Sequence, residues 1–459
     1  MECSFEERKC ELEAECKVSR NMFAAVTSRL KKFMEPFVAG FRRREQKANA
    51  TSVVEGLCSD LEDKNCESIA YLFGQDRKTI QHFVGESQWD DEPLRKELAR
   101  QVGAELGEHD GVIAFDPSAF PKSGKRSVGV SRQWCGRLGK VDNCQVAVYL
   151  GYVSSKGHAL VDTELYLPKE WTDDKERMKR AGVPKHRQRY RTRHEICLEL
   201  LDRRGEQLPH SWITGDDEMG RPAEFRRKLR DRNERYLLAV PCNTTIRDLE
   251  IPAPEYSGKG RPAKLPSCRV DRWTADRSDH DWTEIEVRDG EKGPLKVEAL
   301  KRHVETGKRG RSTVATEMLV VIRYRDRDSA VVKTDYYLSN AEPQTPLAEF
   351  CRAAKAEHRI EECIQRGKGE AGLADYEVRN WIGWHHHQTL SLLASWFLNV
   401  ETRRAEKKDA RHHLQSSPSW HRLHPSRRVA MRYTPRCNVA NRATVASEPV
   451  GQALPLEKA

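Results

Sequence analysis

The chain has 459 residues, of which 37% are apolar and 33% charged, a composition that allows two to four folded domains. No run of eighteen apolar residues occurs and the first residues are acidic and polar, so we expect neither a membrane span nor a secretion signal. The net charge of +10 is weak support for nucleic-acid binding by the folded part, because most of the excess lies after Thr402.

Residues 1–105 have a helical pattern. Apolar side chains recur every three or four positions between Met22 and Phe37, and two shorter helical stretches follow, near Cys66 and Arg77. The pattern predicts an all-helical N-terminal domain. Such a domain suits DNA binding or assembly, and it equally suits any other small bundle.

Residues 106–243 change to alternating strands and helices. Asp116 and Asp216 each follow a short apolar run and are predicted at the carboxyl ends of their strands, the edge where active sites of open α/β sheets form. The alternation predicts an α/β fold with a mixed sheet and flanking helices. The expected elements are strands at 111–116, 144–155, 158–168, 212–216 and 235–241, with helices at 195–206 and 222–234.

Residues 244–339 interrupt this alternation. A segment rich in Pro, Gly and Lys comes first, and strand-like runs follow at 316–325 and 330–339, so we predict a β-rich insertion. The helical pattern resumes over 340–401. After Thr402 the periodicity disappears, and residues 402–459 are expected to form a basic, disordered tail.

The thirteen cysteines are scattered along the chain without a CxxC pair, which argues against zinc ribbons and redox dithiols. We expect reduced thiols. The run from His385 to His387 does not predict a zinc site, because adjacent helix positions point in different directions. Trp171, Trp273 and Trp282 are candidates for base stacking, although most tryptophans pack in cores.

Three acidic side chains carry the predicted chemistry. Asp116 and Asp216 come from strands, and Glu361 lies in the last helical region. Two strand-end aspartates and a helix glutamate can hold two divalent metal ions, an arrangement that cuts phosphodiester bonds. Each acid also has an ordinary explanation, as a cap, a turn residue or a solvated helix acid. Their joint placement favours the metal site.

Basic side chains supply candidate contacts to phosphates. One lysine lies two helical turns after Glu361, on the same helix face. Two segments, 175–193 and 301–311, are rich in Lys and Arg, and the segment 257–264 is similar to an arm that binds the minor groove. A solvated surface or a linker is the alternative explanation for each. The candidates for DNA binding are Lys368, Lys122, Arg187 and Arg261.

Four blocks occur in order between His82 and Arg404: "DPSAFPKSGKRSVGVSRQWCGRLGKVDNCQVAVYLGY", "ELYLPKEW", "WITGDDEMGR" and "IEECIQRGKGEAGLADYEVRNWIGWHHHQTLSLLASWF". The blocks resemble bacterial insertion-sequence transposases of the DDE type. The resemblance implies an RNase H-like catalytic domain with a β-rich insertion before the final glutamate. It also implies a cytoplasmic, nucleoid-associated bacterial protein.

The resemblance assigns the catalytic and metal-binding roles to three acids and a supporting role to one lysine, namely Asp116, Asp216, Glu361 and Lys368. Asp217 stays open as an alternative second acid, and Glu362 and Glu377 as weaker candidates for the third. Related cut-and-paste transposases often carry Tyr and Arg seven and four residues before the glutamate, where this chain has Ala354 and Glu357. Their DNA contacts are therefore not carried over, and the candidates to replace them are Arg359 and His358.

The resemblance implies cleavage at the ends of a mobile element and transfer of the freed 3′-hydroxyl to a target. Two Mg²⁺ ions, which Mn²⁺ can replace, are the expected cofactors. The expected partner is double-stranded DNA bound by a homodimer, with no membrane involved. Two alternatives stay open: a decayed or domesticated transposase that acts as a DNA-binding regulator, and a nuclease that cuts without joining.

Overall fold

One mixed sheet of twelve strands organises the described part of the chain. The structure is a computed structural model that describes residues 25–252, 255, 265–290, 293–307, 314–326 and 330–415. Neighbouring strands follow the order β2-β3-β1-β5-β6-β12-β11-β10-β7-β8, with β4 beside β3 and β9 beside β10. The strands are β1 (Val112–Pro121), β2 (Ser131–Cys135), β3 (Lys140–Ser154), β4 (Gly157–Leu165), β5 (Trp212–Gly215), β6 (Tyr236–Ala239), β7 (Thr245–Asp248), β8 (Cys268–Arg269), β9 (Thr283–Gly290), β10 (Gly293–Thr306), β11 (Ala315–Arg325) and β12 (Val331–Ser339).

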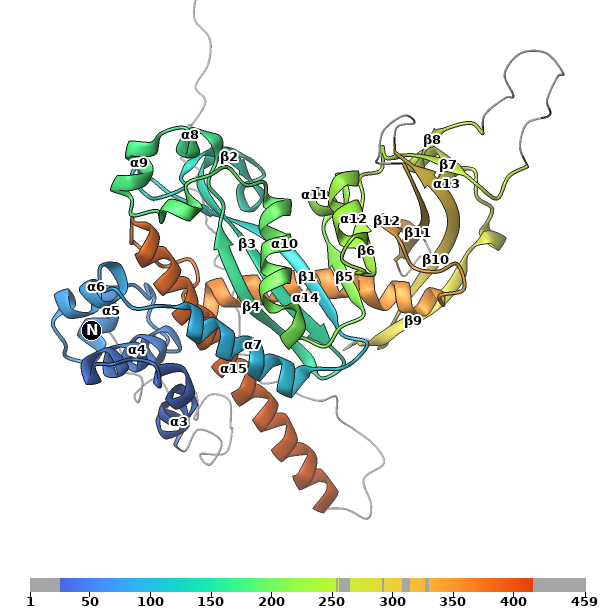
Figure 1. The fold of residues 1–459 in the computed structure, drawn as a ribbon. Coiled ribbons are helices and arrows are strands. Elements are labelled where there is room, and N and C mark those ends of the chain that lie inside the picture. The colour runs from blue at the N-terminus through green and yellow to red at the C-terminus, as the bar shows by residue number, and fades with distance from the viewer. Residues whose placement is uncertain are drawn as a thin grey trace, which may run out of the picture.

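Helices precede, flank and follow this sheet (Figure 1). They are α3 (Val26–Val38), α4 (Arg44–Leu57), α5 (Cys66–Leu72), α6 (Arg77–Gly85), α7 (Glu92–Leu106), α8 (Lys169–Thr172), α9 (Lys175–Arg180), α10 (Arg193–Arg204), α11 (Asp217–Gly220), α12 (Ala223–Arg230), α13 (Val270–Ala275), α14 (Leu347–Glu370) and α15 (Trp381–Gln415).

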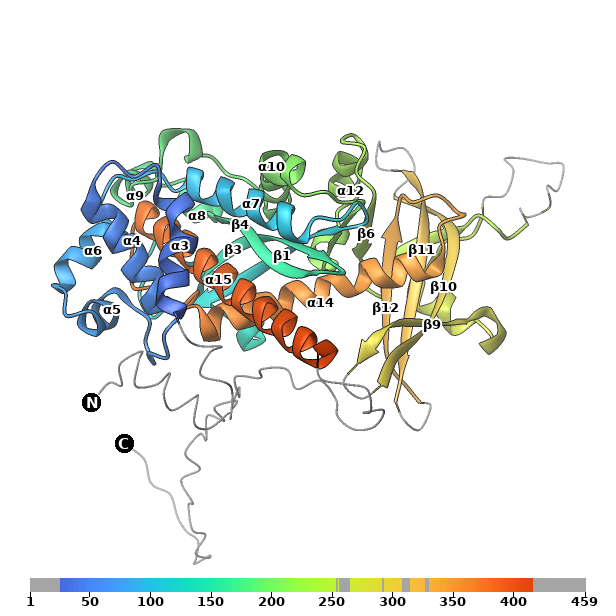
Figure 2. The same cartoon turned by 90° about the horizontal axis from the view of Figure 1, so that it is seen from below.

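β1 is the central strand of the half of the sheet that carries the predicted aspartates. It pairs antiparallel with β3 and parallel with β5, and β5 pairs parallel with β6. Figures 1 and 2 show α10 on one face of these strands and α14 on the other. A capping box between Thr192 and Glu195 fixes the start of α10. The predicted mixed sheet with helices on its faces is therefore confirmed.

α14 lies directly on the sheet because small residues allow a close approach. A Cβ atom added at Gly151 of β3 would lie 2.2 Å from Cδ1 of Ile360, so no larger residue fits there without a shift. Ala353 and Ala356 of α14 are also buried against the sheet side. This contact fixes the height of α14 above the strands and hence the position of its acidic side chains.

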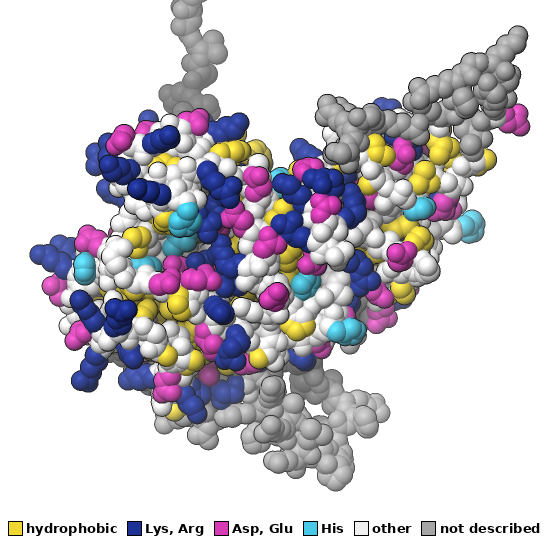
Figure 3. Space-filling view, viewed as in Figure 1, with side chains coloured by type: hydrophobic (Ala, Val, Ile, Leu, Met, Phe, Trp, Pro, Cys, Tyr) yellow, Lys and Arg dark blue, Asp and Glu magenta, His cyan; other side chains and the backbone are white. Residues whose placement is uncertain are grey.

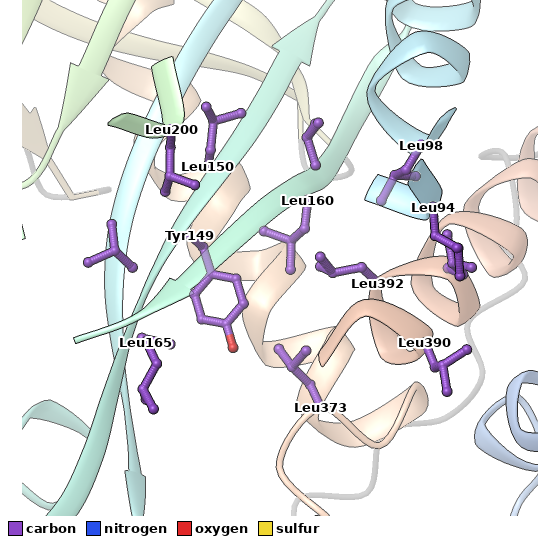
Figure 4. Close-up of a cluster of buried hydrophobic side chains, with 14 of the residues drawn as sticks. Leu94, Leu98, Tyr149, Leu150, Leu160, Leu165, Leu200, Leu373, Leu390 and Leu392 are labelled. Carbon is purple, nitrogen blue, oxygen red and sulfur yellow. The ribbon is translucent and has the colours of Figure 1, made fainter. Parts of the chain in front are cut away.

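The helices before the sheet share its core. Leu94 and Leu98 of α7, Leu390 and Leu392 of α15 and Tyr149 of β3 belong to one buried cluster (Figure 4). The predicted helices of the N-terminal region are present among the described residues. The boundary of a separate N-terminal domain at residue 105 stays a prediction, and the shared cluster shows that α3–α7 do not have a core of their own.

The segment 244–339, predicted to be a β-rich insertion, contains β7–β12 and α13 among the described residues. Its strands continue the same sheet, because Tyr337 of β12 pairs with Ala239 of β6. A buried ion pair also joins the segment to α12, with Nε of Arg226 2.8 Å from Oε1 of Glu317. Local sequence patterns did not predict this continuity, because strand pairing joins residues far apart in the chain.

Two boundaries differ from the expectation. β1 continues to Pro121 and does not end at Asp116, since its pairing with β3 persists after its pairing with β5 stops. α15 continues beyond Thr402 to Gln415. Within this helix, Glu401 forms ion pairs with Arg29 and Arg404. The rest of the predicted tail, residues 416–459, lies outside the described residues.

The three consecutive histidines are buried, and they form hydrogen bonds with different backbone carbonyls. His385 bonds the carbonyl of Trp381, His386 those of Val84 and Trp89, and His387 that of Gly372. They do not converge, as expected for adjacent helix positions. Trp171 is likewise buried and donates to the carbonyl of Val130, which makes it a packing residue. Across the described ranges, no helix is long and apolar enough to cross a membrane, and the described cysteines are free thiols.

Candidate active site

Asp116 and Asp216 occupy equivalent positions on neighbouring parallel strands. Phe115 of β1 pairs with Gly215 of β5, and each aspartate is the next residue along the chain, Asp116 within β1 and Asp216 directly after β5. Adjacent strands lie about 4.8 Å apart, so the two carboxylates start side by side. Both carboxylates lie on the face of the sheet that α14 covers. Trp212 packs in one cluster with the first half of α14, and Asp216, four residues later, points to the same face because side chains alternate along a strand.

Asp216 and Asp217 have different local roles. The carboxylate of Asp216 accepts a hydrogen bond of 3.0 Å from the backbone N–H of Met219 and thereby caps α11. The side chain of Asp217 is exposed and pairs with Arg221 at 3.2 Å. Only Asp216 lies in the register row of Asp116. The geometry therefore favours Asp216 over Asp217 as the second acid.

One face of α14 carries further acids that lie at this edge of the sheet. Glu357, Glu361 and Lys368 follow one another at spacings of four and seven residues, which places them on one helix face. Glu361 is 60% exposed, and its carboxylate lies 3.6 Å from Nδ1 of His358. Glu362 points elsewhere and pairs with Arg359, so the structure favours Glu361 over Glu362 at the cleft.

The acids at this edge resist ionisation. Burial, together with repulsion from Asp216 and Glu361, raises the pKa of Asp116 to about 7. Burial also raises the pKa of Asp216 to about 6, with Glu218 and Asp217 adding to the shift. The pKa of Glu357 is raised to about 8 by burial and by the charges of Asp216 and Asp116. Burial and the neighbouring acids therefore disfavour ionisation here, and the positive charge of Lys368 offsets only part of this effect at Asp116.

Lys368 lies on the same face of α14, near its C-terminal end, and is close to the same acids. Its ammonium group donates to Oγ of Ser118 at 2.8 Å and lies 4.7 Å from the centre of the Phe120 ring. Burial and the positive charge of Arg137 lower the pKa of Lys368 to about 8. At neutral pH it still carries most of its charge, so it can donate hydrogen bonds to a phosphate.

The donor set has the chemistry of a divalent-cation site, because Asp and Glu oxygens are the hard ligands that such ions prefer. Burial first, and repulsion from neighbouring acids second, raise the pKa values of Asp116 and Asp216, and a bound cation would stabilise the ionised form of both. Within the described residues no three His, Cys, Asp or Glu side chains come close enough together to hold one ion. Glu361 is turned toward His358, so its side chain must rotate to join the aspartates.

The acids line an open cleft. Asp216, Asp217 and Glu361 line both of two adjoining cavities, with volumes of about 1310 and 520 Å³. Asp116 and Lys368 line the larger cavity, and Glu357 the smaller. Figure 3 shows a notch in the surface between the part that carries α8 and α9 and the part that carries α11 and α12. The cleft is large enough for an extended polymer.

Comparison with known families identifies the chain. A family model described as a DDE superfamily endonuclease matches residues 36–294, more than half of the chain. The chain belongs to the DDE endonuclease superfamily. This superfamily generally uses divalent metal ions, which agrees with the carboxylate cluster. The match includes Asp116 and Asp216 and ends before Glu361, so the third acid rests on the geometry and on the sequence resemblance.

A curated relative supports the same family. The chain is 30% identical over 194 residues to a probable transposase for insertion sequence element IS701 from Microchaete diplosiphon. The match covers 41% of this chain and 47% of the relative, so the chain spans about half the length of that protein. The resemblance to DDE insertion-sequence transposases is confirmed by these two findings.

One solved structure has a weaker likeness. A cryo-electron microscopy structure of the piggyBac transposase, in a synaptic complex with hairpin DNA, is 10% identical with a TM-score of 0.37. The alignment covers 86% of this chain and 80% of that chain. A likeness at this level adds nothing to the fold assignment.

The predicted DNA-binding residues fall in different places. Lys368 lies in the cleft, as described. The ammonium group of Lys122 donates to the carbonyl of Tyr376 and lies 3.5 Å from the centre of that ring. Arg187 pairs with Glu199 at 2.8 Å, so it is engaged within the protein. Arg261 lies outside the described residues, and its role stays a prediction.

Several residues that line the cleft were not among the predicted site residues. Trp134 and Arg137 come from β2 and the turn after it, and His194 comes from the start of α10, next to Arg193, the last residue of the predicted basic segment 175–193. The strand β2 was overlooked because it is short and largely polar. The signal was present, since glycines at 136 and 139 bracket a turn between two alternating segments.

Proposed function

We propose that this chain is a DNA transposase with Asp116, Asp216 and Glu361 as its catalytic and metal-binding acids. The register of β1 against β5 carries the proposal, because it places two half-buried aspartates side by side on the face of the sheet that α14 covers. Membership of the endonuclease superfamily and the similarity to a probable transposase support it. The strand order β4-β3-β1-β5-β6, with helices on both faces, agrees with the RNase H-like core that the sequence resemblance implies.

The residues suit cleavage followed by joining. Two divalent ions, most simply Mg²⁺ with Mn²⁺ as a substitute, would activate a water and stabilise the leaving oxygen. Asp116 and Asp216 would supply the adjacent ligands, and Glu361 of α14 lines the same cleft. Lys368 is placed to neutralise a phosphate oxygen next to the acids. The freed 3′-hydroxyl would then attack a target phosphodiester in the same site.

A cleavage assay tests the proposal. The full chain is incubated with a supercoiled plasmid that carries the native DNA flanking its gene, in Mg²⁺, Mn²⁺ or EDTA, and new ends are mapped by sequencing. We expect cuts at the boundaries of inverted repeats with either metal. Replacing Asp116 or Asp216 by Ala should lower the cleavage rate at least about a hundredfold while DNA binding persists. The matched control, Asp217→Ala, should retain activity because that carboxylate pairs with Arg221.

The outcomes separate the open alternatives. Cleavage with joined products in a strand-transfer assay supports the transposase, and cleavage without joining indicates a nuclease. Specific DNA binding without cleavage by the wild-type chain indicates a regulator derived from a transposase. Undiminished cleavage by Asp116→Ala would contradict the assignment of the site. Cross-linking on DNA checks the proposed homodimer, which should appear as a two-chain species.

A further inference from the structure

An exposed apolar hairpin stands at the rim of the cleft. It consists of β2, the turn 136–139 and the first residues of β3. Trp134 is 58% exposed, Val141 50% and Leu138 43%, although large apolar side chains are usually covered. Register places Trp134 directly opposite Val141, so the two side chains share the outer face of the hairpin. On the inner face, Cys135 is fully buried.

The hairpin faces the carboxylates. Trp134 and Arg137 line the same cavity as Asp116 and Asp216. In Figure 1, β2 and α11 stand on opposite sides of the notch seen in Figure 3. Arg137 lies close enough to Lys368 to lower the pKa of that lysine. Of the apolar side chains of the hairpin, Trp134 is therefore the one at the cavity where a DNA strand would be cut, with the positive charge of Arg137 beside it.

The charges of the hairpin favour a polyanion. Arg132, Arg137 and Lys140 stand against one acid, Asp142, which pairs with Lys140 at 3.1 Å. Among the described residues, Arg137 makes no hydrogen bond or ion pair. An aromatic face next to an available guanidinium is the arrangement that holds a nucleobase and its phosphate, because every base offers a surface for stacking.

We propose that the hairpin is a nucleotide-binding element, in which Trp134 stacks on an unpaired base of the DNA in the cleft and Arg137 binds the adjacent phosphate. The inference rests on the proposed function, since it takes DNA as the occupant. It adds that the duplex is opened next to the scissile bond, because a stacked and paired base presents no free face. The other explanation is structural, with the Trp134–Val141 pair only stabilising the hairpin.

Binding measurements on the full chain distinguish these explanations. The probes are two duplexes in EDTA, one fully paired and one with a single unpaired 2-aminopurine. We expect the wild type to bind the second duplex roughly tenfold more tightly and to quench its fluorescence. Trp134→Ala should lose the preference and the quenching while its affinity for the paired duplex is kept. Trp134→Phe should retain part of both, because a smaller ring still stacks.

A matched control separates a local effect from general damage. Tyr71 on α5 is 56% exposed and does not line the cleft, so Tyr71→Ala should behave as the wild type. Equal weakening of both duplexes by Trp134→Ala, no change at all, or self-association through the hairpin in place of DNA binding would overturn the proposal. A lower unfolding midpoint with an unchanged preference would indicate the structural explanation.

The test is independent of cleavage. Asp116→Asn should keep the quenching even though it cannot cut. If the wild type shows the Trp134-dependent preference and never cleaves DNA, the transposase proposal fails and the hairpin assignment stands. If it cleaves and joins DNA without that preference, the hairpin assignment alone fails.

Discussion

Replacing Asp116 by Asn should stabilise the metal-free protein at the cost of activity. The pKa of Asp116 rises from 3.8 to about 7 on folding, because the group is buried beside Asp216 and Glu361. Each unit corresponds to about 1.4 kcal/mol, so ionising Asp116 at pH 8 costs at most about 4 kcal/mol of folding free energy. Neighbouring acids can take up protons and relieve part of the repulsion, which lowers the expected gain to about 2 kcal/mol.

The stability difference between Asp116→Asn and the wild type should depend on pH. A carboxyl with a raised folded pKa carries no penalty below its unfolded pKa near 4 and the full penalty above about 7. The advantage of Asp116→Asn should therefore be largest at pH 8 and fall toward zero near pH 4. Urea unfolding in EDTA measures it, and added Mg²⁺ should stabilise the wild type more than the variant.

The matched control is Asp217→Asn, which removes an exposed carboxylate of the same region and should give no stabilisation. If wild type and Asp116→Asn unfold at the same urea concentration at pH 8, the repulsion inferred for the cluster is absent. A difference that does not change with pH would show that packing, and not charge, separates the two proteins.

Two packing contacts give further predictions. Arg226→Ala leaves the buried carboxylate of Glu317 with Arg230, at 3.2 Å, as its remaining ion-pair partner and should lower the free energy of unfolding by about 3 kcal/mol. Arg227→Ala removes only surface ion pairs with Glu224 and Asp231 on the same helix and should change it little. Equal urea midpoints for the two variants would contradict this. Gly151→Val should destabilise the protein by about 1–3 kcal/mol and lower cleavage, and Ile360→Ala should partly restore both, because the added side chain would meet Ile360.

Local patterns predicted the elements that carry the acids. The strand ending at Gly215, helix α12 and strand β6 lie where periodicity and turn residues placed them, because each is a short apolar run between polar boundaries. The long helix with Glu361 was also predicted from its spacing. These elements are set by neighbouring residues, so a sequence alone contains the information.

Other features depend on contacts between distant residues. The continued pairing of β1 with β3 beyond Asp116 is set by strand register, which a single strand does not show. Glu357 was noted only as a departure from related proteins, and its burial beside Asp216 follows from how α14 lies on the sheet. Likewise, the orientation of Glu361 toward His358 is a rotamer choice that spacing cannot predict.

The common core of the helices and the sheet has a consequence for synthesis on the ribosome. α14 and α15 come last among the described elements, yet their side chains complete the cluster that includes α7 and β3. The strands with both aspartates leave the ribosome long before the helix with Glu361. A chain that stops within the β-rich segment would therefore have an unfinished core and an incomplete set of acids. Premature termination should thus leave a chain that neither completes its core nor contains all three acids.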